Sequence, residues 1–319
     1  MTKLRSALLL GIIVSAGLLA ALLARLDWIE FARAFHDVSP LWLGAAAMLT
    51  ALSIAVRALR WTLISGLPSR QWAGVWYAEV VGYVGNLLYP GRVGEILRVA
   101  ALHQLTRIPP GKAVASAFAD RIADLVVLSG ATILVVSHVA GLPGNLLGAA
   151  IVTGLTPLTL FIAVIAFGDV WVRVVGRMAR KLRGQWTERL PRWCAQGVQS
   201  SRALRKPQVL VGVLLLSSVA AVCDYGIMWL VIRAMSWSLP VIAAVTVGIL
   251  ITLGSLLPAA PGYIGIYQVA CMFALRPFGI GESAAIAYSV ILQATVLIVF
   301  VLHGLAAFWR YGALLKQSE

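Results

Sequence analysis

Eight long apolar segments constrain this chain more than any other feature of its sequence. Most are close to the roughly 20 residues that a helix needs to cross the hydrocarbon core of a bilayer. Lipid offers the backbone no hydrogen-bond partner, so such segments are stable there as helices rather than as isolated strands. The segments cover about residues 6–24, 40–57, 71–89, 113–139, 145–168, 208–232, 241–257 and 283–309. The sequence therefore predicts an all-α integral membrane protein, folded as a polytopic helix bundle.

The composition agrees with lipid as the solvent. Of the 319 residues, 61% are hydrophobic and only 12% are charged, against about 25% charged in soluble domains. We expect one transmembrane domain over 1–319, with segment 6–24 kept as its first helix. The histidines have no metal-site spacing, and the odd set of cysteines forms no disulfide framework. We expect no metal and no cofactor. The cysteines are Cys194, Cys223 and Cys271.

The basic residues predict the orientation of the chain. The formal net charge of +14 is explained by the positive-inside rule and by anionic lipid, and we expect no nucleic-acid partner. With 71–106 and 241–275 each entering and leaving on one side, the inner pieces carry 17 Lys and Arg and the outer pieces four. We expect a cytoplasmic (inner) membrane, with both termini cytoplasmic. Two full crossings in place of each re-entrant hairpin give the same count. The inner pieces are 1–5, 57–70, 169–206 and 310–319.

Segment 169–206 is the only sizeable stretch expected outside the membrane. Trp171, Val174, Met178 and Leu182 recur at helical spacing among basic residues. This pattern predicts a cytoplasmic basic amphipathic segment on the inner leaflet. An ordinary basic connecting loop is the alternative.

Two matching interruptions divide the apolar segments. Each contains Leu-Leu followed by Pro-Gly-x-(Val/Ile)-Gly, over residues 86–95 and 255–265. In the orientation above, the two hairpins enter from opposite sides, which is typical of an inverted-topology repeat. We assign 40–139 to the first half and 208–309 to the second, each with a broken, re-entrant hairpin. The hairpin or gating residues are Pro90, Gly91, Gly94, Pro258, Pro261, Gly262 and Gly265.

Charged side chains within the apolar segments mark a candidate site, because a charge at membrane depth is unfavourable by at least ~2.5–3.5 kcal/mol. Arg92 lies in the break itself, where a guanidinium can bind a phosphate with two hydrogen bonds. For Asp120, Arg121 and Asp124, ion pairs between the hairpin and segment 113–139 are the structural alternative. The candidate substrate-binding residues are Asn86, Tyr89, Arg92, Glu95, Arg98, Asp120, Arg121 and Asp124.

Two further carboxylates are not assigned to substrate. Glu79 either pairs or extends toward the interface. Asp224, in segment 208–232, is either paired across the bundle or a proton carrier that couples transport to a gradient.

With these residues in view, the chain resembles the flippase-like transmembrane region of the lysylphosphatidylglycerol synthase family, as found in standalone members without the soluble synthase domain. Asp120 stands where the family more typically has Glu, a shortening that keeps the charge. The resemblance implies movement of a lipid between leaflets. The cargo is an aminoacylated phosphatidylglycerol in bifunctional relatives, and polyprenyl-linked or hopanoid lipids are associated with standalone ones. The residues that carry the resemblance are Arg57-x-x-Arg60-Trp61, the run from Asn86 to Arg98, Asp120-Arg121-x-x-Asp124 and Pro258-x-x-Pro261-Gly262-x-x-Gly265.

The leading hypothesis is a flippase that moves an anionic, aminoacylated or isoprenoid-linked lipid with a phosphate-containing head group. Arg92 and Arg98 would hold the phosphate, while carboxylates meet a cationic substituent or balance the arginines. The alternatives are an intramembrane lipid-modifying transferase and a non-transporting scaffold. Because the sequence has no P-loop, nucleophile elbow or HExxH motif, we expect no enzyme and no direct use of ATP. A lipid-synthesis enzyme is a candidate partner. The oligomeric state, direction and energy source stay open.

Overall fold

The computed structural model describes residues 26–89, 92–139, 206–255 and 261–316, with side chains as far as Trp309, and isolated positions elsewhere. Every regular element within these ranges is a helix, which confirms the predicted all-α class. In chain order these elements are α2 (Trp28–Arg33), α3 (Pro40–Ile64), η1 (Ser69–Gln71), α4 (Trp72–Leu88), α5 (Val93–Thr106), α6 (Pro110–His138), α9 (Pro207–Ala234), α10 (Val241–Gly254), η3 (Pro261–Tyr263), α11 (Ile266–Leu275), η4 (Arg276–Phe278) and α12 (Glu282–Lys316).

Three of the described helices are long and apolar enough to cross a membrane. They are α3, α9 and the part of α12 over Glu282–Trp309. Helix α6 is longer than α3, with 29 residues, or about 43 Å, but it contains four charged residues: Lys112, Asp120, Arg121 and Asp124. The chain is therefore integral to a membrane, as predicted.

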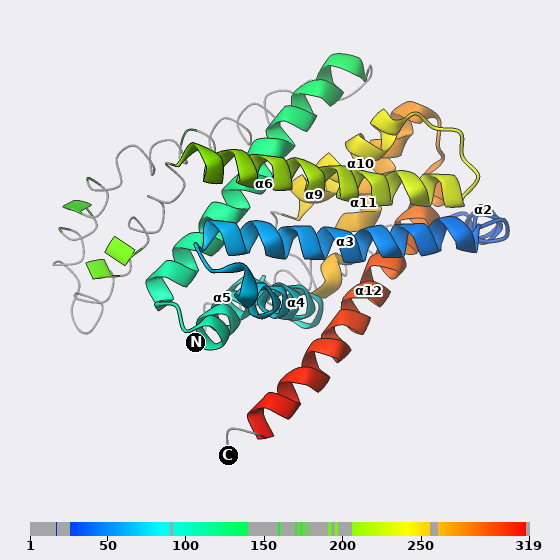
Figure 1. The fold of residues 1–319 in the computed structure, drawn as a ribbon. Helices are drawn as coiled ribbons and strands as arrows, with labels where there is room; N and C mark the ends of the chain where they lie inside the picture. Colours follow the sequence, from blue (N-terminus) through cyan, green and yellow to red (C-terminus); the bar gives the residue numbers. More distant parts are fainter. Residues whose placement is uncertain are drawn as a thin grey trace.

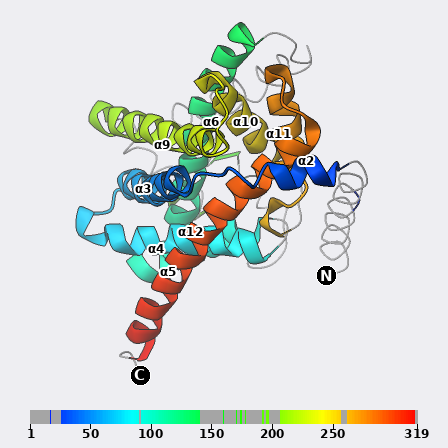
Figure 2. The ribbon, with the colours of Figure 1, turned by 90° about the vertical axis from the view of Figure 1, so that its right-hand side faces the viewer.

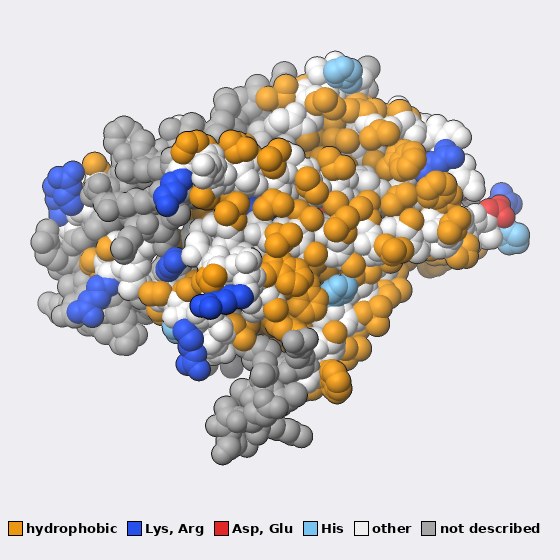
Figure 3. Space-filling view, viewed as in Figure 1, with side chains coloured by type: hydrophobic (Ala, Val, Ile, Leu, Met, Phe, Trp, Pro, Cys, Tyr) orange, Lys and Arg blue, Asp and Glu red, His pale blue; other side chains and the backbone are white. Residues whose placement is uncertain are grey.

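The outer surface of the bundle is apolar between its two ends. Figure 3 shows hydrophobic side chains covering α3 and α9, with Lys and Arg gathered mainly where α3 ends and α9 begins. Exposed side chains along these helices include Met48, Leu52, Leu215 and Val222. Such a surface would be an aggregation liability in water, but it matches a lipid environment.

Helices α3 and α9 form an antiparallel pair that joins the two halves of the sequence (Figure 1). The backbone N–H of Ser39, before α3, donates to the carbonyl of Ala234 at the end of α9, at 2.9 Å. Gly226 of α9 faces Leu49 of α3, and a Cβ atom at Gly226 would come within 2.8 Å of a Leu49 methyl group. The pair packs closely because small residues let the backbones approach.

Helices α4 and α5 form a tight hairpin that crosses α3 and α9 steeply. Figure 2 shows α3 and α9 nearly end-on, whereas α4 and α5 run across the view. A Cβ atom on Gly94 would collide with the carbonyl oxygen of Gly82 and the backbone of Asn86. With 17 and 14 residues, the helices span about 25 and 21 Å, less than the core of a typical bilayer.

The second break lies between α10 and α11 and contains two glycines with positive φ, Gly262 (69°) and Gly265 (90°). Two buried amides hold it. Gln268 accepts from the N–H of Gly265 at 2.7 Å and donates to Gln293 of α12 at 3.1 Å. Gln293 in turn donates to the carbonyl of Gly262 at 2.5 Å. Glycine adopts such φ values without steric cost, which explains why glycine occupies these two positions of the break.

The limits of the helices agree with the predicted segments to within a few residues, with two exceptions. Helix α3 continues beyond 57 to Ile64, and α12 continues beyond 309 to Lys316. Several predictions fall outside the described residues: segment 145–168, the hairpin residues Pro90, Gly91 and Pro258, and nearly all of 6–24 and 169–206. The amphipathic segment thus stays a prediction.

Candidate functional site

Four charged side chains form a fully buried ion network where α3, α4, α5 and α6 meet. Arg60 of α3 pairs with Asp120 of α6 at 2.8 Å. Arg98 of α5 pairs with Glu79 of α4 at 3.0 Å and with Asp120 at 3.3 Å. None of the four side chains is more than 1% exposed. For Asp120 and Glu79 the structure thus has the ion pairing that the sequence left as one alternative.

The sequence places these groups together through helix periodicity. Arg57 and Arg60 are three residues apart on α3, and Asp120 and Asp124 are four apart on α6, so each pair shares one helical face. Trp61 completes the junction. Its ring lies 4.6 Å from the guanidinium of Arg98, and its indole N–H donates to Ser116 at 3.1 Å.

A second set of charges links α3 to α6 and α9. Arg57 pairs with Asp124 at 2.8 Å and with Asp224 at 2.5 Å, and the Ser53 hydroxyl donates to Asp224 at 2.6 Å. Asp224 is therefore paired across the bundle. It lies ten residues before the end of α9, about 15 Å along the helix, and so at membrane depth.

The two sets form one network, joined directly by Arg60, which also pairs with Asp124 at 2.6 Å, and a second time through Glu95 and Arg121. Arg121 pairs with Glu95 at 3.1 Å and with Asp124 at 3.2 Å, while Glu95 reaches Arg98 at 2.9 Å. The network contains four arginines and five carboxylates, a formal charge of −1. Pairing of this kind is what makes charges tolerable at such depth.

Arg92 differs from these four arginines. It precedes α5 with φ of 60° and donates to both the carbonyl and the hydroxyl of Ser255, at the end of α10. No carboxylate of the described ranges lies within ion-pair distance of it, and its Nε has no hydrogen-bond partner there. Arg92 would bring the formal charge of the site to zero, yet its own partners are neutral.

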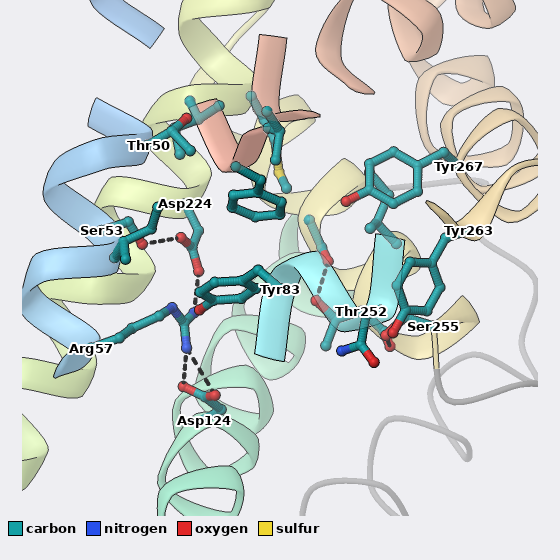
Figure 4. Close-up of a pocket in the computed structure, with 18 of the residues that line it drawn as sticks. Thr50, Ser53, Arg57, Tyr83, Asp124, Asp224, Thr252, Ser255, Tyr263 and Tyr267 are labelled. Atoms are coloured by element: carbon teal, nitrogen blue, oxygen red, sulfur yellow. Dashed lines mark hydrogen bonds and ion pairs between the residues drawn. The ribbon is translucent and has the colours of Figure 1, made fainter. Parts of the chain in front are cut away.

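A cavity of about 410 Å³ opens among these groups, between the two halves of the sequence (Figure 4). This volume is in the range of small-molecule sites, about 300–1,000 Å³. Each described helix from α3 to α12, apart from η1 and η4, contributes at least one residue to the wall of the cavity. The polar and charged lining residues are Thr50, Ser53, Arg57, Tyr83, Asn86, Arg92, Glu95, Arg121, Asp124, Ser217, Asp224, Tyr225, Thr252, Ser255, Tyr263, Tyr267 and Gln293.

The structure separates the candidate substrate-binding residues into two groups. Asn86, Arg92, Glu95, Arg121 and Asp124 line the cavity. Outside this lining are Arg98 and Asp120, which are buried behind it, and Tyr89, which is 53% exposed at the hairpin tip. Among the predicted hairpin residues, Gly262 lines the cavity. Gly94 lies where α4 and α5 are so close that a Cβ atom would not fit. Asn86 also has a structural role, because its side-chain oxygen accepts from the N–H of Gly94 at 2.9 Å.

Sequence reasoning missed Arg57 and Arg60 as members of the site. It assigned them to the inner boundary piece 57–70, but both lie inside α3 with their side chains turned into the bundle. Their spacing on one helical face was the available signal. The tyrosines of the cavity carry no comparable signal, because aromatic residues are common throughout membrane helices.

Comparison with known proteins gives a family match and one informative relative. The profile described as the lysylphosphatidylglycerol synthase TM region matches residues 8–304. The chain is also 22% identical, over 95% of its length, to a protein named glycosyltransferase AglD from Haloferax volcanii. It covers 54% of that protein, so it spans about half the length of this relative. No solved structure matches.

The relative corrects one expectation. We expected no enzyme, but the similar protein carries an enzyme's name, glycosyltransferase. The expectation rested on the absence of familiar short motifs. A short motif cannot reveal a site whose charged side chains come from separate membrane helices. The resemblance noted in the sequence is, by contrast, confirmed: since the family profile extends over 8–304, this chain belongs to the family of the lysylphosphatidylglycerol synthase transmembrane region.

Proposed function

We propose that this protein moves a phosphate-bearing membrane lipid between leaflets, with the head group in the cavity and the chains in lipid. The observation that carries the proposal is a cavity at membrane depth whose charged side chains come from both halves of the sequence. Family membership supports a lipid-related role. Ionisable groups that face an interior cavity within a membrane commonly mark a substrate pathway.

The two breaks fit this proposal. Arg92, beside the first break, bonds to Ser255, beside the second, so the interruptions meet next to the cavity. Transporters built from inverted repeats hold substrate where such broken helices converge. The proposal therefore includes re-entrant hairpins in an inverted repeat over 40–139 and 208–309, and alternating exposure as one half rocks against the other.

Arg92 is the proposed phosphate ligand. It lines the cavity and has only neutral partners within the described ranges. An arginine that already neutralises a carboxylate would have to give up that pair to hold a phosphate, whereas Arg92 would not. Glu95, Asp124 and Arg121 are proposed to border the head group. Asp224, the other candidate from the sequence, is instead paired with Arg57 and is not proposed as a proton carrier. The membrane is proposed to be the cytoplasmic one, with both termini and the basic end of the bundle inside.

The test is leaflet exchange of labelled phospholipids and polyprenyl phosphates in liposomes that contain the purified protein. Arg92→Asn removes the charge and keeps a residue type that tolerates positive φ. Arg107→Asn is the matched control, because Arg107 ends the same helix with φ of 59° and lies on the exposed surface away from the cavity. We expect exchange by wild type and by the control but not by Arg92→Asn. Equal exchange by all three would refute the assigned site.

A second candidate function is transfer of a glycosyl group to or from a membrane lipid, which the name of the relative favours. Carboxylates and arginines at one cavity, such as Asp124 and Arg57, are compatible with such chemistry. Mass spectrometry separates the two candidates, because a transferase changes the mass of the lipid whereas a flippase changes only its leaflet. A change of mass in the presence of a sugar donor, without exchange, would replace the first candidate by the second.

A further inference from the structure

The cavity has two unlike walls. Figure 4 shows Arg57, Asp124 and Asp224 on one side, and Thr252, Ser255, Tyr263 and Tyr267 on the other. The first wall carries opposite charges that are paired with one another. The polar groups of the second wall, from α10, η3 and α11, are hydroxyl groups on aromatic or small side chains, and the wall has no formal charge. The two walls therefore suit chemically different parts of one ligand.

Two tyrosine hydroxyl groups at the cavity are left free for a ligand. Tyr225 and Tyr267 line the cavity, and neither hydroxyl has a hydrogen-bond partner anywhere in the described part of the chain. Figure 4 shows the Tyr267 hydroxyl directed into the interior of the cavity. A tyrosine hydroxyl away from bulk water normally has a partner, so these positions call for polar atoms that the protein does not supply.

Arg92 lies where the neutral wall begins, since its guanidinium contacts Ser255. It faces the cavity together with Tyr263. A phosphate held by Arg92 would thus have uncharged hydroxyl and aromatic groups next to it. A cationic substituent gains little there, because each of the five carboxylates of the network is already paired with an arginine.

We propose that the head group is a glycosyl phosphate, with the phosphate on Arg92 and an uncharged sugar against the neutral wall. The inference deepens the proposed function and rests on it. A sugar ring offers hydroxyl groups to Tyr225 and Tyr267, and its C–H faces pack against aromatic rings. An aminoacyl group is cationic, and the neutral wall offers it no negative charge.

The first test measures binding, which does not depend on transport. The probes are a short-chain isoprenyl phosphate and the same molecule with a hexose on its phosphate, titrated against the purified full chain in detergent. We expect wild type to bind the glycosylated probe more tightly. Tyr267→Phe should reduce this preference about two- to tenfold, as expected for one hydrogen bond. Equal binding of the two probes would overturn the inference.

The matched control is Tyr288→Phe. Tyr288 is fully buried outside the cavity lining, and its hydroxyl donates to the carbonyl of Met228 at 2.9 Å. The substitution makes the same chemical change and should lower stability without altering the preference between probes. An equal loss of preference in both variants would assign the effect to folding and overturn the role of Tyr267.

Leaflet exchange then separates this inference from the proposed function. Faster exchange of the glycosylated lipid supports both. Equal exchange of bare and glycosylated phosphate keeps the flippase and overturns the sugar site, as does preferred exchange of an aminoacylated phospholipid. Selective binding of the glycosylated probe without exchange of any lipid keeps the sugar site and refutes the flippase.

Discussion

Arg92 donates hydrogen bonds to both the carbonyl and the hydroxyl of Ser255, which ties the tip of the α4–α5 hairpin to the end of α10. The two residues are 163 positions apart in the sequence. Because these partners are neutral, the guanidinium satisfies part of its hydrogen-bonding capacity without a direct ion pair. The contact can therefore be exchanged for a phosphate, which offers a stronger, charge-assisted partner.

We predict that Arg92→Lys keeps the charge but loses most of the lipid exchange. A lysine ammonium is a point charge and cannot reproduce the two-pronged geometry of a guanidinium. Loss of one charge-assisted hydrogen bond, about 1.5–3 kcal/mol, corresponds to a reduction of about tenfold or more. The measurement is the initial rate of exchange in liposomes, with Arg107→Lys as the control. Wild-type rates in Arg92→Lys would show that charge alone suffices.

The buried network makes a separate prediction about stability. Asp120→Asn should lower the free energy of unfolding by about 3–5 kcal/mol, because Arg60 and Arg98 would lose a buried counter-charge. Denaturant titration in detergent, followed by tryptophan fluorescence, measures the change. Asp37→Asn provides the control, since Asp37 is 84% exposed, and it should shift stability by less than about 0.5 kcal/mol. A similar, small effect of both substitutions would mean that the buried charges contribute little.

The glycine contact within the hairpin is tested by Gly94→Ala. The added methyl group would meet the backbone of α4 at Gly82 and Asn86, so the helices must separate, with a destabilisation of about 1–3 kcal/mol. Gly130→Ala is the matched control. Gly130 lies within α6 and has open space around its Cβ position, so alanine should stabilise the helix by about 0.5–1 kcal/mol. Opposite signs in unfolding experiments are expected, and destabilisation by both would contradict the packing described for the hairpin.

The extent of the helices could be predicted from the sequence because membrane depth imposes a length on every apolar segment. The partners of the charges could not. Arg57 lies near the predicted end of an apolar segment, where a basic side chain can either extend to the interface or turn inward. Only the packing of α3 against α6 and α9 decides between these, through Asp124 and Asp224.

The cavity shows the same limit. Arg92 was identified from its place beside the break and does line the cavity, but Arg98, six residues along the chain, is buried behind it. The difference depends on which face of α5 meets α6, and an isolated motif does not encode that. Tyr225 and Tyr267 come from α9 and α11, the helices before and after α10 in the chain, so that both line the cavity follows from the fold alone.

A last prediction concerns Gln293, which connects α12 to the second break. Its amide donates to the carbonyl of Gly262 and accepts from Gln268, while Gln268 accepts from the N–H of Gly265. Gln293→Leu would leave the Gly262 carbonyl and the side-chain N–H of Gln268 without these partners, so we expect a loss of about 1–3 kcal/mol in unfolding free energy. Gln293 also lines the cavity, so exchange should fall even at temperatures where the variant stays folded.

Gln293→Glu separates the two effects. A carboxylate still accepts from Gln268 but has no N–H for Gly262, and it brings an additional negative charge to a cavity that is formally neutral once Arg92 is included. Binding of a short-chain isoprenyl phosphate should therefore weaken more in Gln293→Glu than in Gln293→Leu, and the difference should shrink at high salt if the cavity is open to ions. If the two variants bind the phosphate equally, Gln293 acts only on the backbone of the break and lies too far from the head group to influence its charge.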